Sequence, residues 1–477
     1  MTTNLYTQAD WGAVTPLFVV GITALVVLLA DLFAKRHSNR YLSLLLGVLG
    51  LGAAAVICAQ SYGQDYAAFG GGFVLGGFTV VFEEIILLAA GFSLALYGAI
   101  GSEDRMAGVV ALMLWGTSGA MLMAGAANLM TIFLGLELLS LALYCLCGMA
   151  ARPAAREAAL KYLILSSAAS GFMLYGMALL FGASGSVTLS ALTAASVAAS
   201  PFFWMGCGLF LVGLAFKLSL VPFHVWAPDV YEGAPLPVTA FMSVVTKTGA
   251  LAVFARFTYA ALPSGAAAHL LLPMWIVAGA SMLVGNLGML AQTDIKRLLA
   301  YSGIAQIGYI VAALAGGTSQ GLRYAIYYLA AYTFMNLGAF AVVALCSTDK
   351  EEGSHVAALH GLAYRRPALA AAMTVFLLAL AGFPPTAGFL GKVFILATNV
   401  GSGYAWLAAL LIIGTAISLY AYFKVIRAMY DRAPSHRVVD VRPVAPLAWL
   451  SLAICLAGVI AMTFYPLTPS NVLPLVK

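Results

Sequence analysis

The chain alternates between long apolar runs and short polar or glycine- and proline-containing intervals. Fourteen runs reach about the 20 residues that an α-helix needs to cross a bilayer. The runs are continuous rather than ten-residue alternations, which favours helices over a transmembrane β-barrel. We therefore expect an all-α polytopic membrane protein of about 14 transmembrane helices. They cover roughly 12–34, 41–60, 79–100, 106–126, 128–149, 156–182, 201–227, 237–261, 269–290, 297–316, 321–346, 367–398, 403–430 and 444–466.

Two of these runs contain proline in their interiors. Pro222 interrupts the seventh run, and Pro384 and Pro385 interrupt the twelfth. Proline removes a backbone donor and clashes with the preceding turn, so we expect helices 7 and 12 to be broken. The freed carbonyls are tolerated at membrane depth only where they face protein or water. In secondary transporters, such a pair of interruptions indicates the functional site.

The spacing of the two breaks predicts an internal repeat. Lys217 and Lys392 lie within eight residues of the breaks and are 175 residues, or five helices, apart. Five crossings are an odd number, so the second copy must be inverted. We expect a single transmembrane domain over 1–477, divided as follows: flanking helices 1–3 in 1–105, a first repeat (helices 4–8) in 106–261, a second repeat (helices 9–13) in 269–430 and a last helix in 444–466.

Composition supports the membrane assignment. The chain is 63% hydrophobic and 8% charged, whereas a soluble domain carries about 25% charged residues. The first run follows no Lys or Arg and ends in no small-residue cleavage site, so we expect a retained spanning helix rather than a signal peptide. The longest polar stretch, 347–366, is only a loop. The sequence contains no CxxC, HExxH, GxGxxG or Walker motif, and we expect no metal, iron–sulfur or nucleotide site.

The net charge of +6 reflects topology rather than a nucleic-acid surface. Of the 23 Lys and Arg residues, fifteen fall in odd-numbered loops, and at most three, Arg256, Arg323 and Lys477, fall in even-numbered loops or ends. The positive-inside rule places the odd loops in the cytoplasm and both termini outside. A full set of helices without a transit peptide favours a bacterial inner membrane.

Five charged residues fall inside the apolar runs, namely Glu137, Lys161, Lys217, Lys247 and Lys392. A charge near the bilayer centre costs about 2.5–3.5 kcal/mol on insertion scales, so five of them suggest a route for charge. Burial favours the neutral amine and a nearby carboxylate favours the ammonium, so each lysine can act as a switchable proton carrier. Arginine would not serve, because it stays protonated.

Position along the helices orders these carriers. At about 1.5 Å per residue, Glu137 and Lys247 lie some 13–15 Å deep, near the midplane. Lys161 and Lys217 lie toward the cytoplasm and Lys392 toward the outside. His224, just after the first break, titrates near neutrality and is a further relay candidate.

Each carrier also has a structural interpretation. Lys161 could reach the cytoplasmic surface along its stem. Lys217 and Lys392 could cap carbonyls at the breaks, Glu137 and Lys247 could form a static ion pair, and His224 could be a packing residue.

Other charges in or beside the runs receive no relay role. Lys424 and Asp31 lie near cytoplasmic helix ends, where we expect anchors. For Glu83 and Glu84, about one turn into the third helix, we expect hydration.

Several long motifs resemble the antiporter-like membrane subunits of NADH-quinone oxidoreductase (respiratory complex I). They are KLSLVPFHVWAPDVYEGAPLPVTAFMSVVTKTG (217–249), QTDIKRLLAYSGIAQIGYI (292–310), MNLGAF (335–340) and FLGLELLSLALYCL (133–146). Within this superfamily, LAGFPPTAGFLGK (380–392) and EAALKYLILSSAASGFMLYG (157–176) look like subunit N, since subunit M has a glutamate where Lys392 stands. The likeness covers most of residues 80–465. Glu83-Glu84 departs from it, where the family has a basic or neutral residue.

The resemblance implies a fourteen-helix subunit with two inverted five-helix half-channels. It implies that Glu137 is the key glutamate of helix 5, Lys217 its paired lysine, Lys247 the central lysine of helix 8 and Lys392 the terminal carrier of helix 12. The family picture also includes Lys161 and His224. NADH, FMN, iron–sulfur clusters and quinone are expected in partner subunits, and no cofactor in this chain.

The resulting hypothesis is a proton-translocating subunit of an NADH:quinone oxidoreductase complex. The rivals are a subunit of a multisubunit sodium/proton antiporter or membrane-bound hydrogenase, and a structural spacer. Lysine only donates and cannot ligate Na⁺, which argues against sodium. Co-purification with flavin and iron–sulfur subunits would distinguish the oxidoreductase subunit from the first rival. Substitution of Lys247 or Glu137 by alanine would distinguish it from a structural spacer, which would keep proton pumping if the complex still assembled.

Overall fold

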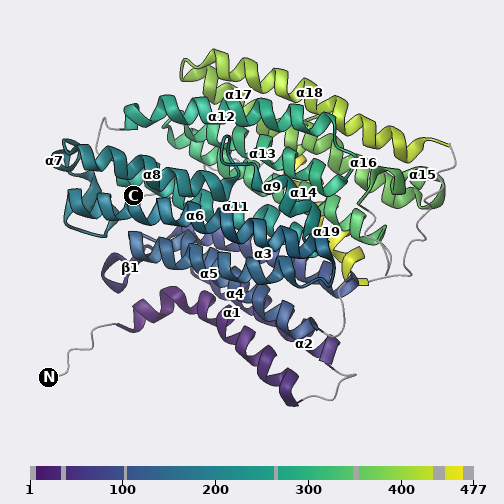
Figure 1. The fold of residues 1–477 in the computed structure, drawn as a ribbon, viewed down its shortest axis with the longest axis horizontal. Coiled ribbons are helices and arrows are strands. Elements are labelled where there is room, and N and C mark those ends of the chain that lie inside the picture. Colours follow the sequence, from purple (N-terminus) through teal and green to yellow (C-terminus); the bar gives the residue numbers. More distant parts are fainter. Residues whose placement is uncertain are drawn as a thin grey trace.

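The computed structural model describes residues 7–33, 39–100, 105–262, 267–347, 354–432 and 446–465. Its helices run side by side along one direction, with α1 (Gln8–Phe33) and α2 (Asn39–Gln60) at one edge and α17 (Ala387–Gly401) and α18 (Ala405–Tyr430) at the other (Figure 1). Thirteen described helical segments are long and apolar enough to cross a membrane. Two shorter apolar helices, α16 (Pro367–Ala381) and α17, form one further broken crossing. The prediction of fourteen crossings is confirmed.

The remaining elements follow in chain order. The first part contains β1 (Tyr66–Ala68), η1 (Phe69–Gly71), β2 (Phe73–Leu75), α3 (Gly77–Ile100), α4 (Met106–Gly125), α5 (Leu129–Gly148), α6 (Pro153–Ser184), η3 (Leu189–Thr193), α7 (Ala195–Ala198), α8 (Pro201–Leu218) and α9 (Trp226–Gly233). The second part contains α10 (Leu236–Phe241), η4 (Met242–Thr246), α11 (Lys247–Arg256), η5 (Phe257–Ala261), α12 (Ala267–Leu290), α13 (Ile295–Leu314), α14 (Ser319–Leu345), η6 (Val356–Leu359), α15 (Leu362–Arg365), α16, α17, α18 and α19 (Pro446–Phe464).

Both predicted helix breaks are present, and they share a local design. The helix α8 ends at Ser219, a residue with φ of 58°, and α9 starts only at Trp226. The helix α16 ends at Gly382, with φ of 79°, and α17 starts at Ala387. A left-handed residue ends the helical hydrogen-bond pattern, and the prolines that follow cannot resume it. The first break is tied to the second half of the chain, because the Val221 N–H donates to Ser281 Oγ of α12 at 3.0 Å.

The eighth crossing contains an irregularity that the apolar pattern did not indicate. The π-helical turn η4 separates α10 from α11, so Lys247 is the first residue after the turn. Residues of α14 hold this turn: Tyr332 donates to the Ser243 carbonyl at 3.4 Å and Asn336 to Ser243 Oγ at 2.7 Å. π turns inside helices frequently mark functional positions, and here one directly precedes a buried lysine.

A short antiparallel hairpin, β1–β2, was not expected between the second and third helices. Two glycines allow it, since Gly70 and Gly71 have φ of 62° and 86°, a region that glycine adopts at no steric cost. Asp10 of α1 fixes the hairpin by accepting hydrogen bonds from the Phe69 N–H at 2.8 Å and the Tyr66 hydroxyl at 3.2 Å.

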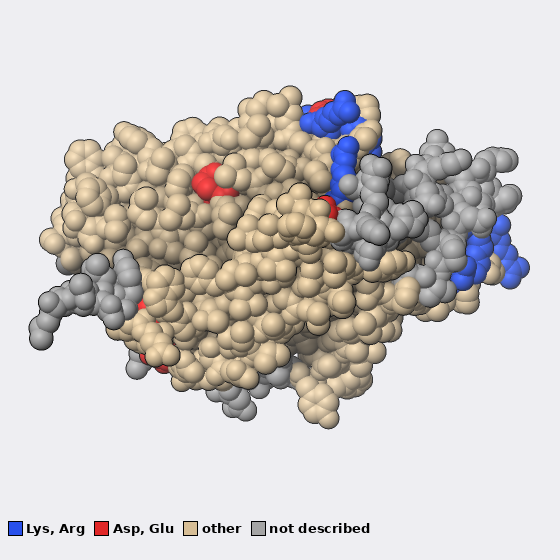
Figure 2. Space-filling model, turned by 90° about the horizontal axis from the view of Figure 1, so that it is seen from below, with Lys and Arg blue, Asp and Glu red and all other residues tan. Residues whose placement is uncertain are grey.

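Described basic side chains gather at one end of the crossings. In Figure 2, Lys and Arg lie at one end of a face that is otherwise almost free of basic residues. We call this the basic end; it contains Arg105, Arg152, Arg156, Lys296, Arg297, Arg365, Arg366, Arg427 and Arg432. The other end, where β1, β2 and the last residues of η5 lie, is the opposite end. Six of the basic residues that were counted in loops and chain ends lie outside the described residues, namely Lys35, Arg36, Lys350, Arg437, Arg442 and Lys477.

One expectation about charges outside the relay is wrong. Glu83 is only 1% exposed, and its Oε2 accepts a hydrogen bond from Cys58 Sγ at 3.2 Å. It is therefore not hydrated, because α2 packs over this face of α3. Arg256, which the charge count grouped with the even-numbered loops and ends, lies within the eighth crossing in the last turn of α11, where it is 6% exposed.

Candidate functional site

Lys217 lies in the last turn of α8, just before the first break, and is 2% exposed. Its Nζ donates to Ser166 Oγ at 2.8 Å and to the Tyr162 hydroxyl at 3.3 Å, both on α6. It also lies 5.0 Å from the centre of the Tyr162 ring. Hydroxyls both accept and donate hydrogen bonds, so these contacts can hold the amine in either protonation state. The partners are side chains of another helix, and the interpretation of Lys217 as a cap for the break is not supported.

Glu137 on α5 is half-buried and accepts a hydrogen bond from Ser170 Oγ at 2.5 Å. Ser170 follows Ser166 by four residues on α6, so the two serines lie on the same helix face. The carboxylate and the Lys217 amine are thus bound to neighbouring hydroxyls of one helix. Within the described ranges, Glu137 forms no ion pair with Lys217 or Lys247. The static Glu137–Lys247 pair considered from the sequence is therefore wrong.

Lys247 is 1% exposed and lies near the middle of the eighth crossing. Its Nζ is 5.9 Å from the ring centre of Tyr231 and 5.8 Å from that of Tyr332. Among the described residues this amine has no hydrogen-bond partner. Gly303 of α13 faces it so closely that a Cβ at that position would lie 2.2 Å from Nζ. Burial of an amine without a hydrogen-bond partner costs free energy, so this position is unlike that of an ordinary structural lysine.

Aromatic side chains connect Lys217 with Lys247. The rings of Tyr162 and Trp226 stack at 4.7 Å, and Trp226 contacts Tyr231 edge-on at 6.2 Å. Trp226, the first residue of α9, is held by a hydrogen bond from its Nε1 to the Phe216 carbonyl at 2.9 Å. The restart of the broken helix therefore supplies the side chain that fills the space between the two lysines.

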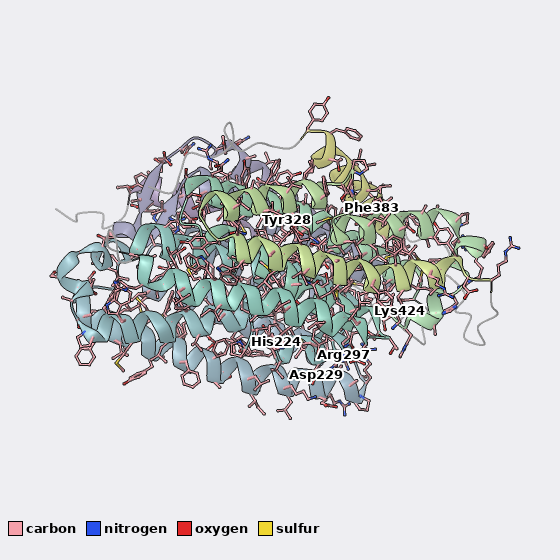
Figure 3. The ribbon with its side chains drawn as sticks, turned by 90° about the horizontal axis from the view of Figure 1, so that it is seen from above. His224, Asp229, Arg297, Tyr328, Phe383 and Lys424 are labelled. Carbon is pink, nitrogen blue, oxygen red and sulfur yellow. The ribbon has the colours of Figure 1, made fainter. Side chains whose placement is uncertain are left out.

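A second group of buried hydroxyls leads from Lys247 toward Lys392. Tyr332 and Tyr328 are four residues apart on one face of α14. The Tyr328 hydroxyl donates to Gln306 Oε1, and its ring lies 6.4 Å from that of Tyr309. Tyr328 lies well inside the helix bundle in Figure 3. These residues are buried and come from α13 and α14, so they form a polar interior within the second repeat.

Lys392 on α17 is 4% exposed and belongs to the second break. Its Nζ donates to the carbonyls of Leu380 and Ala381 at 3.2 and 2.9 Å, which are the last carbonyls of α16. It also lies 4.9 Å from the centre of the Tyr309 ring. The interpretation of Lys392 as a cap is thus confirmed geometrically, and the same amine reaches the polar interior. The two break lysines therefore differ in how they are held.

Lys161 does not join the buried lysines. Its side chain is 43% exposed, and its Nζ forms ion pairs with Glu157 at 2.8 Å and with Asp229 at 3.0 Å. Arg297 of α13 binds Asp229 at 2.7 Å and Glu232 at 2.9 Å. Figure 3 shows Asp229 and Arg297 side by side toward the basic end. These five residues, which we call the ion-pair cluster, line a cavity of about 280 Å³ between α6, α9 and α13.

His224 lies between α8 and α9 and is half-buried. Figure 3 places it closer to the middle of the molecule than Asp229. Its Nδ1 is buried without a hydrogen-bond partner among the described residues. The structure brings it to the first break but gives it no contact with a relay lysine.

Asp229 is the central residue of the ion-pair cluster, and the sequence analysis missed it. Burial alone would raise the pKa of its carboxyl, but hydrogen bonds from Lys161 and Arg297 outweigh this effect and hold the pKa below its usual value. The available signal was the spacing of Asp229 and Glu232, three residues apart, which places two carboxylates on one face of a short helix. Lys296 was also missed: it was assigned to a loop, yet it is 1% exposed and its Nζ donates to the Ala234 carbonyl at 2.9 Å.

We expect Asp229→Asn to loosen α9 without unfolding the chain. The substitution keeps the shape but removes one carboxylate from two partly exposed ion pairs, which costs about 1 kcal/mol. Thermal unfolding of the purified assembly should show a lower midpoint, and proton pumping should fall only a few-fold. Glu157→Gln, which leaves Asp229 with both cations, is the matched control and should have a smaller effect.

The pH dependence of this difference follows from the depressed pKa of Asp229. A carboxyl with a lowered folded-state pKa stabilises above its ordinary value, about 3.9, and this stability is lost as the pH falls through the folded-state value. The gap between wild type and Asp229→Asn should therefore stay constant from about pH 5 to 8 and shrink below about pH 4. A gap that already closes near pH 6 would contradict this assignment of the cluster.

Comparison with known proteins agrees with the geometry. Residues 126–418 match the family described as NADH:quinone oxidoreductase/Mrp antiporter, TM. The chain is 41% identical over 469 residues to NADH-quinone oxidoreductase subunit N 1 of Symbiobacterium thermophilum, covering 94% of this chain and 95% of that protein. It is 39% identical over 464 residues to NADH-quinone oxidoreductase subunit N of Trichlorobacter lovleyi, covering 95% and 94%.

Solved structures with the same fold include a chain of respiratory complex I from Thermus thermophilus with bound aureothin. The TM-score is 0.82 at 32% identity, over 95% of this chain and 98% of that one. A chain of the Mrp complex from Dietzia sp. matches with a TM-score of 0.85 at 21% identity, over 97% and 95% respectively, which shows the fold alone. The chain belongs to the subunit N family of NADH-quinone oxidoreductase, the antiporter-like membrane subunits of respiratory complex I.

Proposed function

We propose that this chain carries protons across the membrane for an NADH:quinone oxidoreductase, through Glu137, Lys217, Lys247 and Lys392. Electron transfer takes place in other subunits of the complex, which hold NADH, FMN, iron–sulfur clusters and quinone. The present chain supplies the proton path and makes the assembly a translocase. Its relatives carry the name of this oxidoreductase, and the fold is that of a complex I membrane subunit.

The observation that carries the proposal is the set of three buried lysines, each beside a helix irregularity. Lys217 precedes the first break, Lys247 follows the π turn, and Lys392 caps the second break. Irregular backbone inside a membrane is tolerated where it faces protein or lines a polar cavity. A purely structural scaffold would gain nothing from placing an ionisable amine at each of these three positions, because each costs several kcal/mol to bury.

The contacts suggest a role for each carrier. Glu137 attracts the proton of Lys217 across the adjacent serines of α6, and loss of this attraction would release the proton toward Lys247. Lys247, which has no hydrogen-bond partner among the described residues, is the carrier most easily switched. Lys392 would receive the proton at the other end of the buried tyrosines. Lys161 and His224 would act at the basic end and at the first break.

The division into two half-channels is part of this proposal. The first repeat, 106–261, ends with the crossing that carries Lys247, and the second, 269–430, contains Lys392. The matching breaks, each of which begins with a left-handed residue after a helix, support the division. We further propose that the basic end faces the cytoplasm of a bacterium, that the complex lies in its inner membrane and that both termini are outside.

Both breaks lie at the surface of the isolated chain, which agrees with its place in a complex. Val225 in the first break is 67% exposed and Phe383 in the second is 44% exposed. Lipid cannot satisfy the backbone groups of such segments. Neighbouring membrane subunits of the oxidoreductase would therefore cover both breaks. Glu137, which is half-buried on α5, would lie close to a further contact between this chain and a neighbouring subunit.

Gly303→Ala tests the proposal with a minimal change. The new methyl group would lie 2.2 Å from Lys247 Nζ and 3.1 Å from the Tyr332 hydroxyl. The flexible end of the lysine can move away, so the fold should persist while the amine leaves its place. We expect NADH-driven proton pumping in membrane vesicles to fall by about tenfold, the effect of roughly 1.4 kcal/mol on a barrier.

The control is Gly208→Ala on α8, where an added Cβ meets no atom within 4 Å. It should pump like wild type. NADH oxidation by an artificial electron acceptor, a reaction of the other subunits, should be unchanged in both variants, and co-purification of each variant chain with those subunits shows that the complex is assembled. Undiminished pumping by Gly303→Ala in sodium-free buffer would argue against Lys247 as a carrier, and pumping that requires Na⁺ would favour an antiporter.

A further inference from the structure

Arg256 is a buried cation that the proton relay does not use. It occupies the last turn of α11, is 6% exposed and lies five residues before the end of the crossing at Ala261. The apolar pattern placed it near the end of the eighth run, 237–261. The structure places its guanidinium inside the bundle, between α11, α3 and α4.

The groups around Arg256 are neutral. Its Nη2 donates to Thr79 Oγ1 at 3.0 Å and to the Ala124 carbonyl at 3.1 Å, and its guanidinium lies 5.1 Å from the centre of the Phe78 ring. The Nε has no partner among the described residues. Glu83, one turn beyond Thr79, is bonded to Cys58 instead, and within the described part of the chain no carboxylate forms an ion pair with Arg256.

A guanidinium differs from the relay amines in a decisive respect. Lysine can lose its proton when buried, whereas arginine keeps its charge at every accessible pH. Arg256 follows Lys247 by nine residues, two and a half helical turns, so the two side chains lie on opposite faces of the crossing. The arginine therefore cannot pass a proton on, and it is not placed as a partner of Lys247.

We propose that Arg256 is an electrostatic plug that keeps protons from entering the first repeat from the opposite end of the membrane. A fixed positive charge in a narrow, low-dielectric passage repels cations, as arginines do in water-selective channels. The guanidinium is bonded to neutral groups of α3 and α4, and no carboxylate of the described residues forms an ion pair with it. The proposal rests on the proton path proposed above, because a plug has a purpose only where a path exists behind it.

The test is passive proton leak in proteoliposomes that contain the purified complex, with no NADH present. A potassium gradient and valinomycin set the membrane potential, and an entrapped pH dye reports proton entry. Arg256→Gln keeps an amide that can bond to Thr79 and Ala124 but removes the charge. We expect about a tenfold faster leak, since a unit charge a few ångströms from the passage changes the local proton population by at least that factor.

Thr79→Val is the matched variant, because it removes one hydrogen bond to Arg256 and leaves the charge. It should leak like wild type, whereas Arg256→Lys should leak more than wild type, because a buried lysine can lose its proton. Arg256→Met, a second neutral variant, should leak like Arg256→Gln. Loss of an unpaired buried charge is not expected to destabilise the chain, and co-purification of each variant chain with the other subunits reports assembly.

Equal leak in Arg256→Gln, Arg256→Met and wild type would overturn the plug, and so would a leak in Thr79→Val as large as in Arg256→Gln. The second result would assign Arg256 to packing. Because leak is measured without electron transfer, these results are independent of whether Gly303→Ala pumps. Normal pumping by Gly303→Ala together with a charge-dependent leak would reject the Lys247 relay and retain the barrier.

Discussion

Lys247→Met should abolish most of the proton pumping that depends on this chain while leaving the complex assembled. Methionine has a similar length and fills the space between Tyr231 and Tyr332 without an ionisable group. The buried amine forms no hydrogen bond with the described residues, so its removal leaves no donor or acceptor unpaired there. The fold should therefore be as stable as wild type or more stable.

The size of the effect follows from the missing proton site. A proton that moves between Tyr231 and Tyr332 would have to cross an apolar gap, and each 1.4 kcal/mol added to that barrier lowers the rate about tenfold. A loss of tenfold or more is therefore expected in NADH-driven acidification of inverted vesicles. Thr248→Val removes a neighbouring polar group that bonds only to its own helix, at the Val244 carbonyl, and should pump normally. Pumping by Lys247→Met at the wild-type rate would show that Lys247 is structural.

Lys217→Arg should be nearly as damaging, although it conserves the charge. A guanidinium can satisfy the contacts that a structural cation makes here, namely the Ser166 and Tyr162 hydroxyls and the Tyr162 ring, since arginine also stacks on aromatic rings. It cannot release the proton. Loss of pumping by about tenfold or more in an assembled complex would therefore separate proton transfer from charge placement.

The matched substitution is Lys424→Arg on α18. Lys424 is exposed and donates to the Leu290 and Gln292 carbonyls at 3.4 and 3.3 Å, contacts that arginine can also make. It should pump like wild type. If Lys217→Arg pumps equally well, a fixed positive charge is sufficient at that position, and Lys217 is not a proton carrier.

The crossings and their breaks are determined by residues that are close together in the sequence. The positions of the crossings were correct to within a few residues, because a bilayer requires a minimum apolar length and tolerates few charges. The breaks in helices 7 and 12 were also correct, because the missing N–H of Pro222 and Pro384 acts within one turn. The η4 turn was not indicated, since its residues are ordinary helix-compatible apolar ones and α14 stabilises it from outside.

The sequence predicted which residues belong to the candidate site, but it did not predict the contacts that they make. Lys217, Lys247 and Lys392 are all buried, as their places within apolar runs indicated. Lys161, which the pattern placed near the cytoplasmic end of its run, lies in a partly exposed cluster with Asp229 and Glu157. The difference arises because Asp229 follows Lys161 by 68 residues and lies in α9, the helix that resumes after the first break. No local sequence pattern links Lys161 with Asp229.

The sequence by itself determined how many times the chain crosses the membrane, where two crossings break and which ionisable residues enter the apolar layer. Only the tertiary structure decided what each of those residues meets: carbonyls for Lys392, hydroxyls for Lys217, a space facing Gly303 for Lys247, and the interior rather than water for Glu83 and Arg256. The physical reason is that these helices are apolar on all sides. Their periodicity therefore does not reveal which face turns inward, and packing between helices distant in the chain settles it.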